Sequence, residues 1–191
     1  MKMLKISLLR FGLLTLTFIC FLSTSYRAMA QQLFPEDPQT GLFTHSKVIF
    51  IDSTSKDELF LRGKTWFTTH PDMQQAEIKS EDAAGGIISS LATKTITLSE
   101  SGKDVEVPVH FLVNIYVKGS RCKYEFTEVT LDIDGKTGVK AENYFKGNKL
   151  SGLEKQALSK TKRAILSIEK SLIGAMTNND EEAIVRRYKS E

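Results

Sequence analysis

The sequence contains few of the residues from which metal and catalytic sites are built. Its 191 residues include two cysteines, three histidines and one tryptophan. The histidines His45, His70 and His110 lie far apart, whereas zinc sites usually show close pairs of Cys or His. No serine lies in a G-x-S-x-G pattern. We therefore expect no catalytic residue, no metal and no cofactor.

Two partial motifs depart from the patterns that they resemble. The segment 132–136 begins like a calcium-binding loop, but Lys136, Thr137 and Asn143 stand where such a loop needs an oxygen ligand, a glycine and a glutamate. The segment 63–65 ends like a phosphate-binding loop but lacks the required upstream glycine. We interpret the Asp-Gly pair of the first segment as a turn and both resemblances as chance.

Acidic residues are absent from the start of the chain, where the first is Glu36. An apolar run covers residues 11–22, and the small residues of an A-x-A site occupy 28–30. Three cations precede the run: Lys2, Lys5 and Arg10. This order is typical of a secretory signal, so we predict cleavage after Ala30 and a periplasmic or extracellular protein. The run is shorter than the ~20 residues of a membrane span, so we expect no stable span after cleavage.

Cleavage would change the charge and the cysteine content of the chain. It would remove four cations and no acid, which lowers the formal charge from +3 to −1. A near-neutral domain lacks the basic footprint of nucleic-acid binders, so we expect no nucleic-acid partner. Cys20 leaves lipidation as an alternative, but the bulky Ile19 before it disfavours that processing. Cys122 would then be the one remaining cysteine, which excludes an internal disulfide and favours a buried thiol.

No repeat or linker divides the rest of the chain. We predict an extended lead-in over 31–46, a single domain over 47–178 and a charged tail over 179–191. A short β-branched strand at 48–51 precedes a helix that opens with a capping box at Ser55 to Glu58 and ends before Pro71.

Apolar residues then alternate with polar ones from residue 75 to 131, which predicts four strands joined by short turns. The segment 132–149 is polar and predicts a long loop. A second capping box, Ser151 to Glu154, opens a helix whose apolar stripe ends at Met176. The stripe consists of Leu153, Ala157, Thr161, Ala164, Ile165, Ile168, Leu172 and Met176. The order β-α-β-β-β-β-α predicts an α+β fold in which helices pack on one face of an antiparallel sheet.

Several short motifs occur in a fixed order along residues 33–132. They are Leu33-Phe34-Pro35, Thr40-Gly41-Leu42, the strand Lys47–Ile51, Ser55-Lys56-Asp57-Glu58-Leu59, Trp66 and the strand Arg121–Phe126. In this order they resemble the domain-of-unknown-function family 4468, exported proteins of Gram-negative envelopes with a TBP-like fold. The resemblance implies that fold, and it brings no assigned activity or catalytic residue. "TBP-like" describes a topology and does not imply DNA binding.

If the helices cover one face of the sheet, alternate side chains of two strands line the other face. We predict a candidate interaction surface composed of His110, Leu112, Asn114, Tyr116, Arg121 and Lys123. Glu125 and Thr127 continue the same alternation. Aromatic residues with a polar tip suit interfaces. The alternative is a solvated sheet face, which antiparallel sheets often have.

Three functions stay open. The first is a non-enzymatic binding or accessory domain of the cell envelope, whose partner is an envelope protein or a small ligand. It would use the predicted surface or the loop at 132–149. The second is an envelope enzyme of hydrolase type, with a site assembled from scattered residues such as His110 and Glu125. The third is a structural domain that associates through its C-terminal helix, and the charged tail argues against it.

Overall fold

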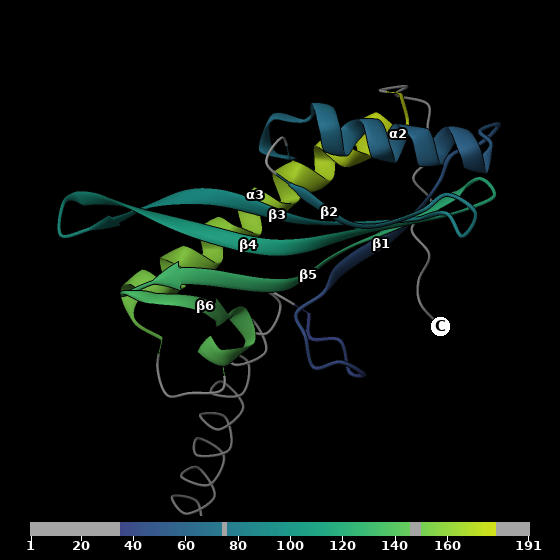
Figure 1. The fold of residues 1–191 in the computed structure, drawn as a ribbon. Helices are drawn as coiled ribbons and strands as arrows, with labels where there is room; N and C mark the ends of the chain where they lie inside the picture. Colours follow the sequence, from purple (N-terminus) through teal and green to yellow (C-terminus); the bar gives the residue numbers. More distant parts are fainter. Residues whose placement is uncertain (1–34, 74–75, 146–149, 179–191) are drawn as a thin grey trace, which may run out of the picture. The chain divides into compact units, whose positions relative to one another are not determined.

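The computed structural model describes residues 35–73, 76–145 and 150–178, which lie in the compact unit Glu36–Glu191 apart from Pro35 (Figure 1). The predicted signal at 1–30 and the charged tail at 179–191 lie outside the described residues, as does the first part of the lead-in.

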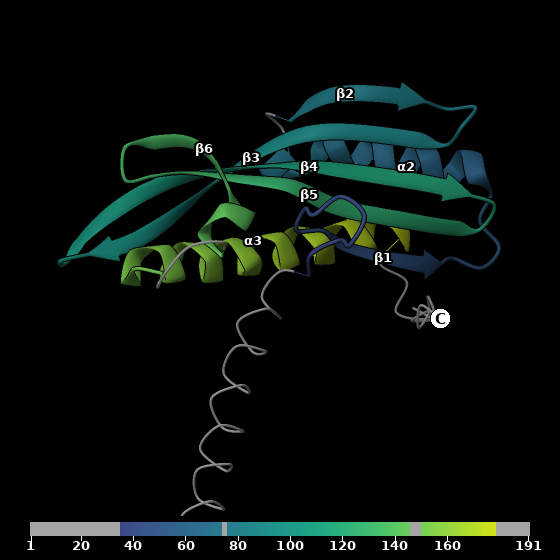
Figure 2. The same cartoon turned by 90° about the horizontal axis from the view of Figure 1, so that it is seen from below.

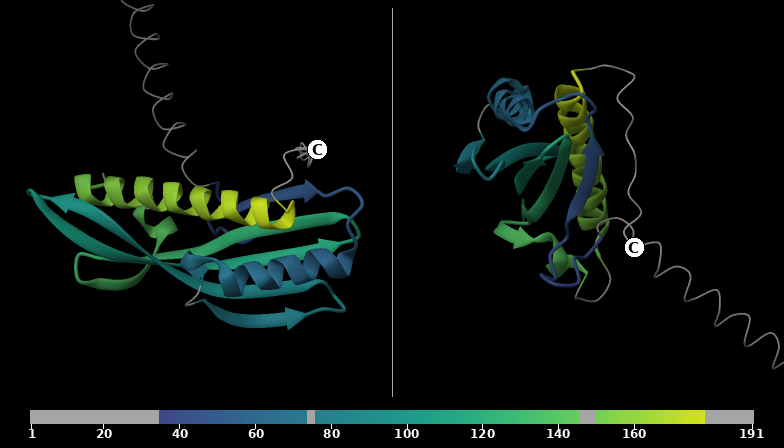
Figure 3. Two further views of the ribbon diagram at one scale, coloured as in Figure 1. Left: turned by 90° about the horizontal axis from the view of Figure 1, so that it is seen from above. Right: turned by 90° about the vertical axis from the view of Figure 1, so that its right-hand side faces the viewer.

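One antiparallel sheet dominates the unit. Its strands are β1 (His45–Phe50), β2 (Glu77–Asp82), β3 (Ile87–Glu100), β4 (Lys103–Lys118), β5 (Arg121–Ile133) and β6 (Lys136–Lys140). They lie in the order β1-β5-β4-β3-β2, and β6 pairs with the end of β5. The helices α2 (Lys56–Thr69) and α3 (Gly152–Met176) cover the same face of this sheet (Figure 3). The predicted α+β architecture and the four-strand meander are confirmed.

The prediction of a loop over 132–149 is wrong in its first part. β5 continues to Ile133, and β6 returns beside it before a short 3-10 helix, η2 (Ala141–Tyr144). Asp134 and Gly135 have φ angles of 54° and 70°, so this Asp-Gly pair forms the hairpin turn that such pairs favour. Four of the five β6 residues are exposed. The strand therefore has no apolar alternation by which the sequence could reveal it.

A bulge in β5 changes which side chains face the helices. The register between β4 and β5 shifts beside Glu128, whose φ angle is 53°. Cys122, Tyr124 and Phe126 face the core before this point, and Val129, Leu131 and Ile133 do so after it. An extra residue in a strand reverses the alternation, so the core is continuous along a strand whose sequence pattern is not.

Both helices begin as the sequence predicts. The Ser55 hydroxyl accepts a 3.2 Å hydrogen bond from the Glu58 amide, but the Glu58 carboxylate pairs with Arg62 at 3.0 Å instead of closing the box. At α3 the box is complete, because Glu154 Oε2 also accepts from the Ser151 amide at 2.7 Å. Among the described residues, no helix is both long and apolar enough to cross a lipid bilayer.

The buried stripe of α3 differs from the predicted one at four positions. Leu153 and Ala164 are half-exposed, whereas Leu158 and Glu169 are buried. The buried carboxylate of Glu169 is the feature that the apolar pattern does not predict.

The described part of the lead-in is folded against the domain. Asp37 accepts hydrogen bonds from the amides of Gln39 and Thr40, which closes a turn, and Glu36 bridges to Phe43. Phe43 is buried, and its amide donates a 2.6 Å hydrogen bond to Glu142 on η2. This loop therefore extends the domain before the predicted boundary at 47.

Candidate interaction surface

The face of the sheet opposite the two helices is here called the open face. It carries the outward side chains of β3, β4 and β5, and Figure 2 views the sheet from this side. Along β4 the inward residues from Val107 to Val117 are buried at every second position, and the residues between them point outward. The strict alternation of β4 is what places the predicted residues on this face.

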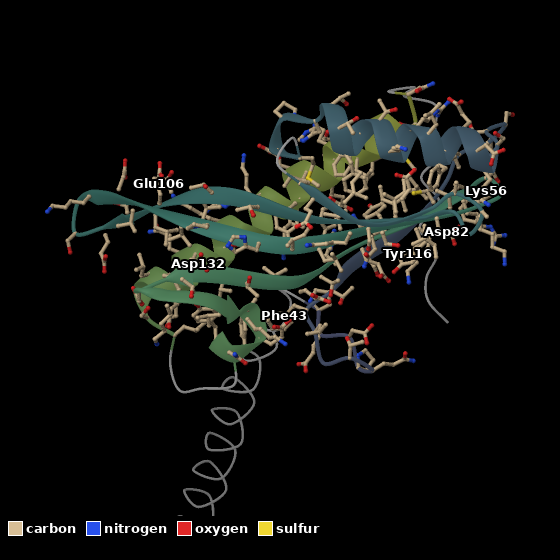
Figure 4. The ribbon with its side chains drawn as sticks, viewed as in Figure 1. Phe43, Lys56, Asp82, Glu106, Tyr116 and Asp132 are labelled. Atoms are coloured by element: carbon tan, nitrogen blue, oxygen red, sulfur yellow. The ribbon has the colours of Figure 1, made fainter. Side chains whose placement is uncertain are left out.

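All six predicted residues lie on β4 and β5, and the strand register shows how they are grouped. Tyr116 lies opposite Lys123, and the next pair towards the turn is Lys118 and Arg121. Leu112 and Asn114 follow along β4, and His110 lies beyond them. Figure 4 shows Tyr116 and Asp132, which contacts His110, towards opposite ends of the sheet. The six therefore form a row along β4 and the start of β5 rather than one compact pocket.

Tyr116 anchors one end of the row. Its hydroxyl donates a 3.2 Å hydrogen bond to Glu125 Oε2, and Lys123 Nζ lies 2.6 Å from Glu125 Oε1. The same ammonium group lies 5.7 Å from the centre of the Tyr116 ring. Burial raises the pKa of Tyr116, and the neighbouring Glu125 carboxylate raises it further. The phenol therefore stays neutral, and its hydrogen bond to Glu125 holds it in place.

Arg121 belongs to the same end of the open face. Its guanidinium carbon lies 4.9 Å from the ring centre of Phe50 on β1, a cation–π contact. The side chain is exposed, so its charge is available to a partner.

The centre of the row is more apolar and more enclosed than the alternation alone predicts. Leu112 lies opposite Leu91, and Asn114 lies opposite Ser89, whose hydroxyl donates to Asn114 Oδ1. Asn114 is only 8% exposed. It therefore supports its neighbours more than it offers a contact of its own.

His110 closes the other end of the row. Its Nδ1 lies 2.8 Å from the Thr93 hydroxyl, and its Nε2 lies 3.4 Å from Asp132 Oδ2. A hydrogen bond from the Gly138 amide lowers the pKa of Asp132, burial opposes this effect, and the contact with His110 adds to the lowering. The imidazole is thus held between a hydroxyl and a carboxylate.

β3 also contributes side chains to this face, although none of the six predicted residues lies on it. Ile87 and Leu91 lie opposite Tyr116 and Leu112, and both are half-exposed. We call Ile87, Leu91, Leu112 and Tyr116 the apolar row of the open face. The alternation of Ile87, Ser89 and Leu91 in the sequence was the available signal.

The pairing of His110 with Glu125, on which the enzyme alternative relied, does not occur. Glu125 lies opposite Asn114 and contacts Tyr116 and Lys123, whereas the acid beside His110 is Asp132. Among the described residues no group of three or more His, Cys, Asp or Glu side chains could hold a metal ion. Burial raises the pKa of the Cys122 thiol to about 12, so this cysteine is protonated and unreactive.

A second polar cluster lies under α3, on the helix-covered side. Glu169 is 4% exposed, and its Oε1 accepts hydrogen bonds from Lys47 Nζ at 2.5 Å and from the Tyr124 hydroxyl at 2.6 Å. Its Oε2 lies 3.0 Å from His45 Nε2. Burial alone raises the pKa of Glu169, but the contact with His45 and the hydrogen bonds from Lys47 and Tyr124 outweigh burial and hold it at about 2. The carboxylate is therefore ionised and joins α3 to β1 and β5.

With this geometry in view, the chain can be compared with known proteins. Residues 45–131 match the family described as a domain of unknown function (DUF4468) with TBP-like fold. The chain resembles the DUF4468 family. The matched range runs from the first residue of β1 to Leu131 near the end of β5, so it contains α2 and every strand of the open face.

Two crystal structures have the same fold. A DUF4468 family protein from Bacteroides ovatus ATCC 8483 gives a TM-score of 0.62 at 18% identity, covering 75% of this chain and 90% of that one. A TBP-like protein from Parabacteroides distasonis ATCC 8503 gives a TM-score of 0.60 at 18% identity, covering 75% of this chain and 97% of that one. No curated protein sequence matches the chain. The TBP-like fold and the DUF4468 resemblance expected from the sequence are confirmed, and the family has no known function.

Proposed function

We propose that this chain is an exported, non-enzymatic binding or accessory domain of the cell envelope, which recognises an envelope protein or a small ligand through the open face. The observation that carries the proposal is the apolar row of Ile87, Leu91, Leu112 and Tyr116 on the face that the helices leave uncovered.

The surroundings of the apolar row support a recognition surface rather than a plain solvated face. Tyr116 and Lys123 are held by Glu125, and Asn114 is held by Ser89. Side chains fixed in this way lose little conformational freedom when a partner binds. Arg121 adds an exposed charge at the rim. Arginine and tyrosine are both enriched at interfaces relative to the rest of a protein surface.

Site-specific crosslinking in the cell of origin tests the open face. A photoreactive amino acid is placed at Leu112 in one strain and at Leu61 in another, because Leu61 is 57% exposed but lies on α2. We expect a discrete adduct from position 112 that position 61 does not give. Identical adduct patterns, or none from position 112, would rule out the open face as the binding surface.

A triple variant, Leu112→Ala, Tyr116→Ala and Arg121→Ala, then tests whether the adduct depends on these side chains. It is compared with Leu61→Ala, which alters an exposed leucine away from the open face. Retention of binding by the folded triple variant would contradict the proposal. Export has its own test: amino-terminal sequencing of the envelope form should begin at Gln31, and an uncleaved cytoplasmic chain would contradict it.

A hydrolase is the second candidate, and one observation favours it. His110 lies between the Thr93 hydroxyl and the Asp132 carboxylate. A nucleophile, a base and a carboxylate that orients the base are arranged in the same way in hydrolases. The candidate predicts slow hydrolysis of an activated ester that Thr93→Val and His110→Gln both abolish, while Thr95→Val, a neighbouring exposed threonine, retains it. Equal rates in all three variants would dismiss it.

A further inference from the structure

The surface of α3 that faces away from the sheet has an unusual charge distribution. The helix carries five cations and two acids. The cations are Lys155, Lys160, Lys162, Arg163 and Lys170. Glu154 is engaged in the capping box, and Glu169 is buried and ionically paired with Lys47. The charge that the helix presents outward is therefore positive.

Four of the cations lie on one side of the helix. With 3.6 residues per turn, Lys155, Lys162, Arg163 and Lys170 fall within an arc of about 100°. Leu166 lies inside the same arc and is 38% exposed. The buried stripe, which includes Thr161, Ile165 and Ile168, lies on the opposite side. We call these five residues, Lys155, Lys162, Arg163, Leu166 and Lys170, the basic stripe.

Three cations of the basic stripe differ from several paired lysines of the domain. Lys64, Lys79 and Lys94 each lie within 2.7 Å of a carboxylate oxygen of Glu81, Glu77 or Asp72. Lys155, Arg163 and Lys170 form no ion pair within the described part of the chain, although all three are exposed. The described residues therefore leave these three charges without a carboxylate partner, and such charges attract an anionic partner.

We propose that the basic stripe docks the domain peripherally on an anionic lipid surface. Cations in a row attract the phosphate groups of anionic lipids. The exposed Leu166 among them can enter the boundary between headgroups and acyl chains. A nucleic acid offers phosphates but no apolar layer for Leu166. The near-neutral domain also lacks the broad basic surface that is typical of nucleic-acid-binding proteins. The stripe lies on the helix side of the sheet, so docking leaves the open face accessible (Figures 2 and 3). The proposal does not depend on the function proposed for that face.

The test measures sedimentation with lipid vesicles. It uses residues 36–191, because the apolar run at 11–22 would bind vesicles by itself. This unit contains the whole described core and is compact on its own, so it is expected to fold. Vesicles of phosphatidylcholine are compared with vesicles of phosphatidylcholine and phosphatidylglycerol in a three-to-one ratio. We expect binding to the anionic vesicles only, and weaker binding at high salt.

Two charge-matched variants locate the binding surface. Lys155→Gln, Arg163→Gln and Lys170→Gln together should weaken binding on the order of 100-fold, about five-fold for each cation. Lys103→Gln, Lys118→Gln and Lys136→Gln remove the same charge at exposed strand ends and should change it less than ten-fold. Circular dichroism shows whether each variant is folded, which exposed substitutions should preserve.

Three results would overturn the proposal. Equal binding to neutral vesicles would remove the electrostatic basis. Equal losses of vesicle affinity in the two triple variants would show that net charge, and not the basic stripe, causes the binding. Tighter binding to duplex DNA than to anionic vesicles, lost in the first triple variant, would assign the stripe to nucleic acid instead. Leu166→Gln should weaken vesicle binding, whereas Leu61→Gln should leave it unchanged.

Discussion

The hydroxyl of Tyr124 on β5 donates a 2.6 Å hydrogen bond to Glu169 on α3, inside the layer between sheet and helix. The same carboxylate accepts from Lys47 on the edge strand β1. A charged acceptor strengthens such bonds, and their removal leaves buried polar groups without partners. Glu169 therefore holds together three elements that are distant in the sequence.

Glu169→Gln should destabilise the domain by about 2–3 kcal/mol, because removing one member of a buried ionic cluster leaves the others uncompensated. The loss is smaller than for a fully buried pair because the side chain of Lys47 is 42% exposed and can turn to solvent. Urea unfolding followed by fluorescence measures the change, since the single tryptophan, Trp66, is buried. Glu58→Gln, whose side chain is 48% exposed beside Arg62, is the control and should change stability by less than about 0.5 kcal/mol.

The stability of the domain should depend on pH through the carboxylate of Glu169. The pKa of Glu169 is lowered to about 2 in the folded state from an ordinary 4.5. The contribution of Glu169 to the free energy of unfolding is therefore complete above about pH 4.5 and is lost as the pH falls towards 2. Its maximum is roughly 3 kcal/mol. Unfolding free energies between pH 6 and pH 2 should fall less steeply in Glu169→Gln than in the wild-type chain. Parallel curves would assign the acid sensitivity to other carboxylates.

Two tyrosines provide a matched test of buried hydroxyl groups. Tyr124→Phe removes a hydrogen bond to a buried carboxylate and should destabilise the domain by about 2 kcal/mol. The Tyr144 hydroxyl is buried and has no partner among the described residues, so Tyr144→Phe should be neutral or stabilise by up to about 1 kcal/mol. Chemical unfolding of both variants gives the comparison. A larger loss for Tyr144→Phe would mean that its hydroxyl is satisfied in solution.

Two glycines with similar backbone angles should respond differently to alanine. Gly102 has a φ angle of 79° and open space around its Cβ position, so Gly102→Ala should cost about 1 kcal/mol for the left-handed backbone alone. Gly86 has a φ angle of 73°, and a Cβ there would lie 2.3 Å from the Val117 carbonyl oxygen. Gly86→Ala should therefore cost about 3 kcal/mol or more, because the β2–β3 turn must move. Thermal unfolding of both variants measures the difference, and equal effects would show that the turn relaxes freely.

The elements with strong local signals could be predicted from the sequence. The capping serines and the alternation of β4 locate both helices and the central strand, since these patterns depend on neighbouring residues. β6 lacks such a signal because it packs few side chains against the core. The reversed alternation after Glu128 also depends on pairing with β4, which no local pattern reveals.

The candidate surface and the Glu169 cluster were likewise predictable only where the signal lies in neighbouring residues. The outward residues of β4 follow from alternation, but their hydrogen-bond partners Ser89 and Asp132 come from other strands. Glu169 falls within the buried stripe of α3, although a charged side chain predicts a surface position. Its partners Lys47 and His45 occupy the inward positions of β1, and this pairing of opposite charges is visible only in three dimensions.

The position of β1 has a consequence for how the chain folds. β1 is the first strand in the sequence, yet it pairs with β5, so it cannot join the sheet until β2 to β5 have been synthesised. The meander can form hairpin by hairpin, whereas the β1 edge must await a contact between distant segments, which is slow to close. The edge strand should therefore be unformed in the rate-limiting transition state. A conservative substitution there, Ile49→Val, would then accelerate unfolding and leave the folding rate nearly unchanged.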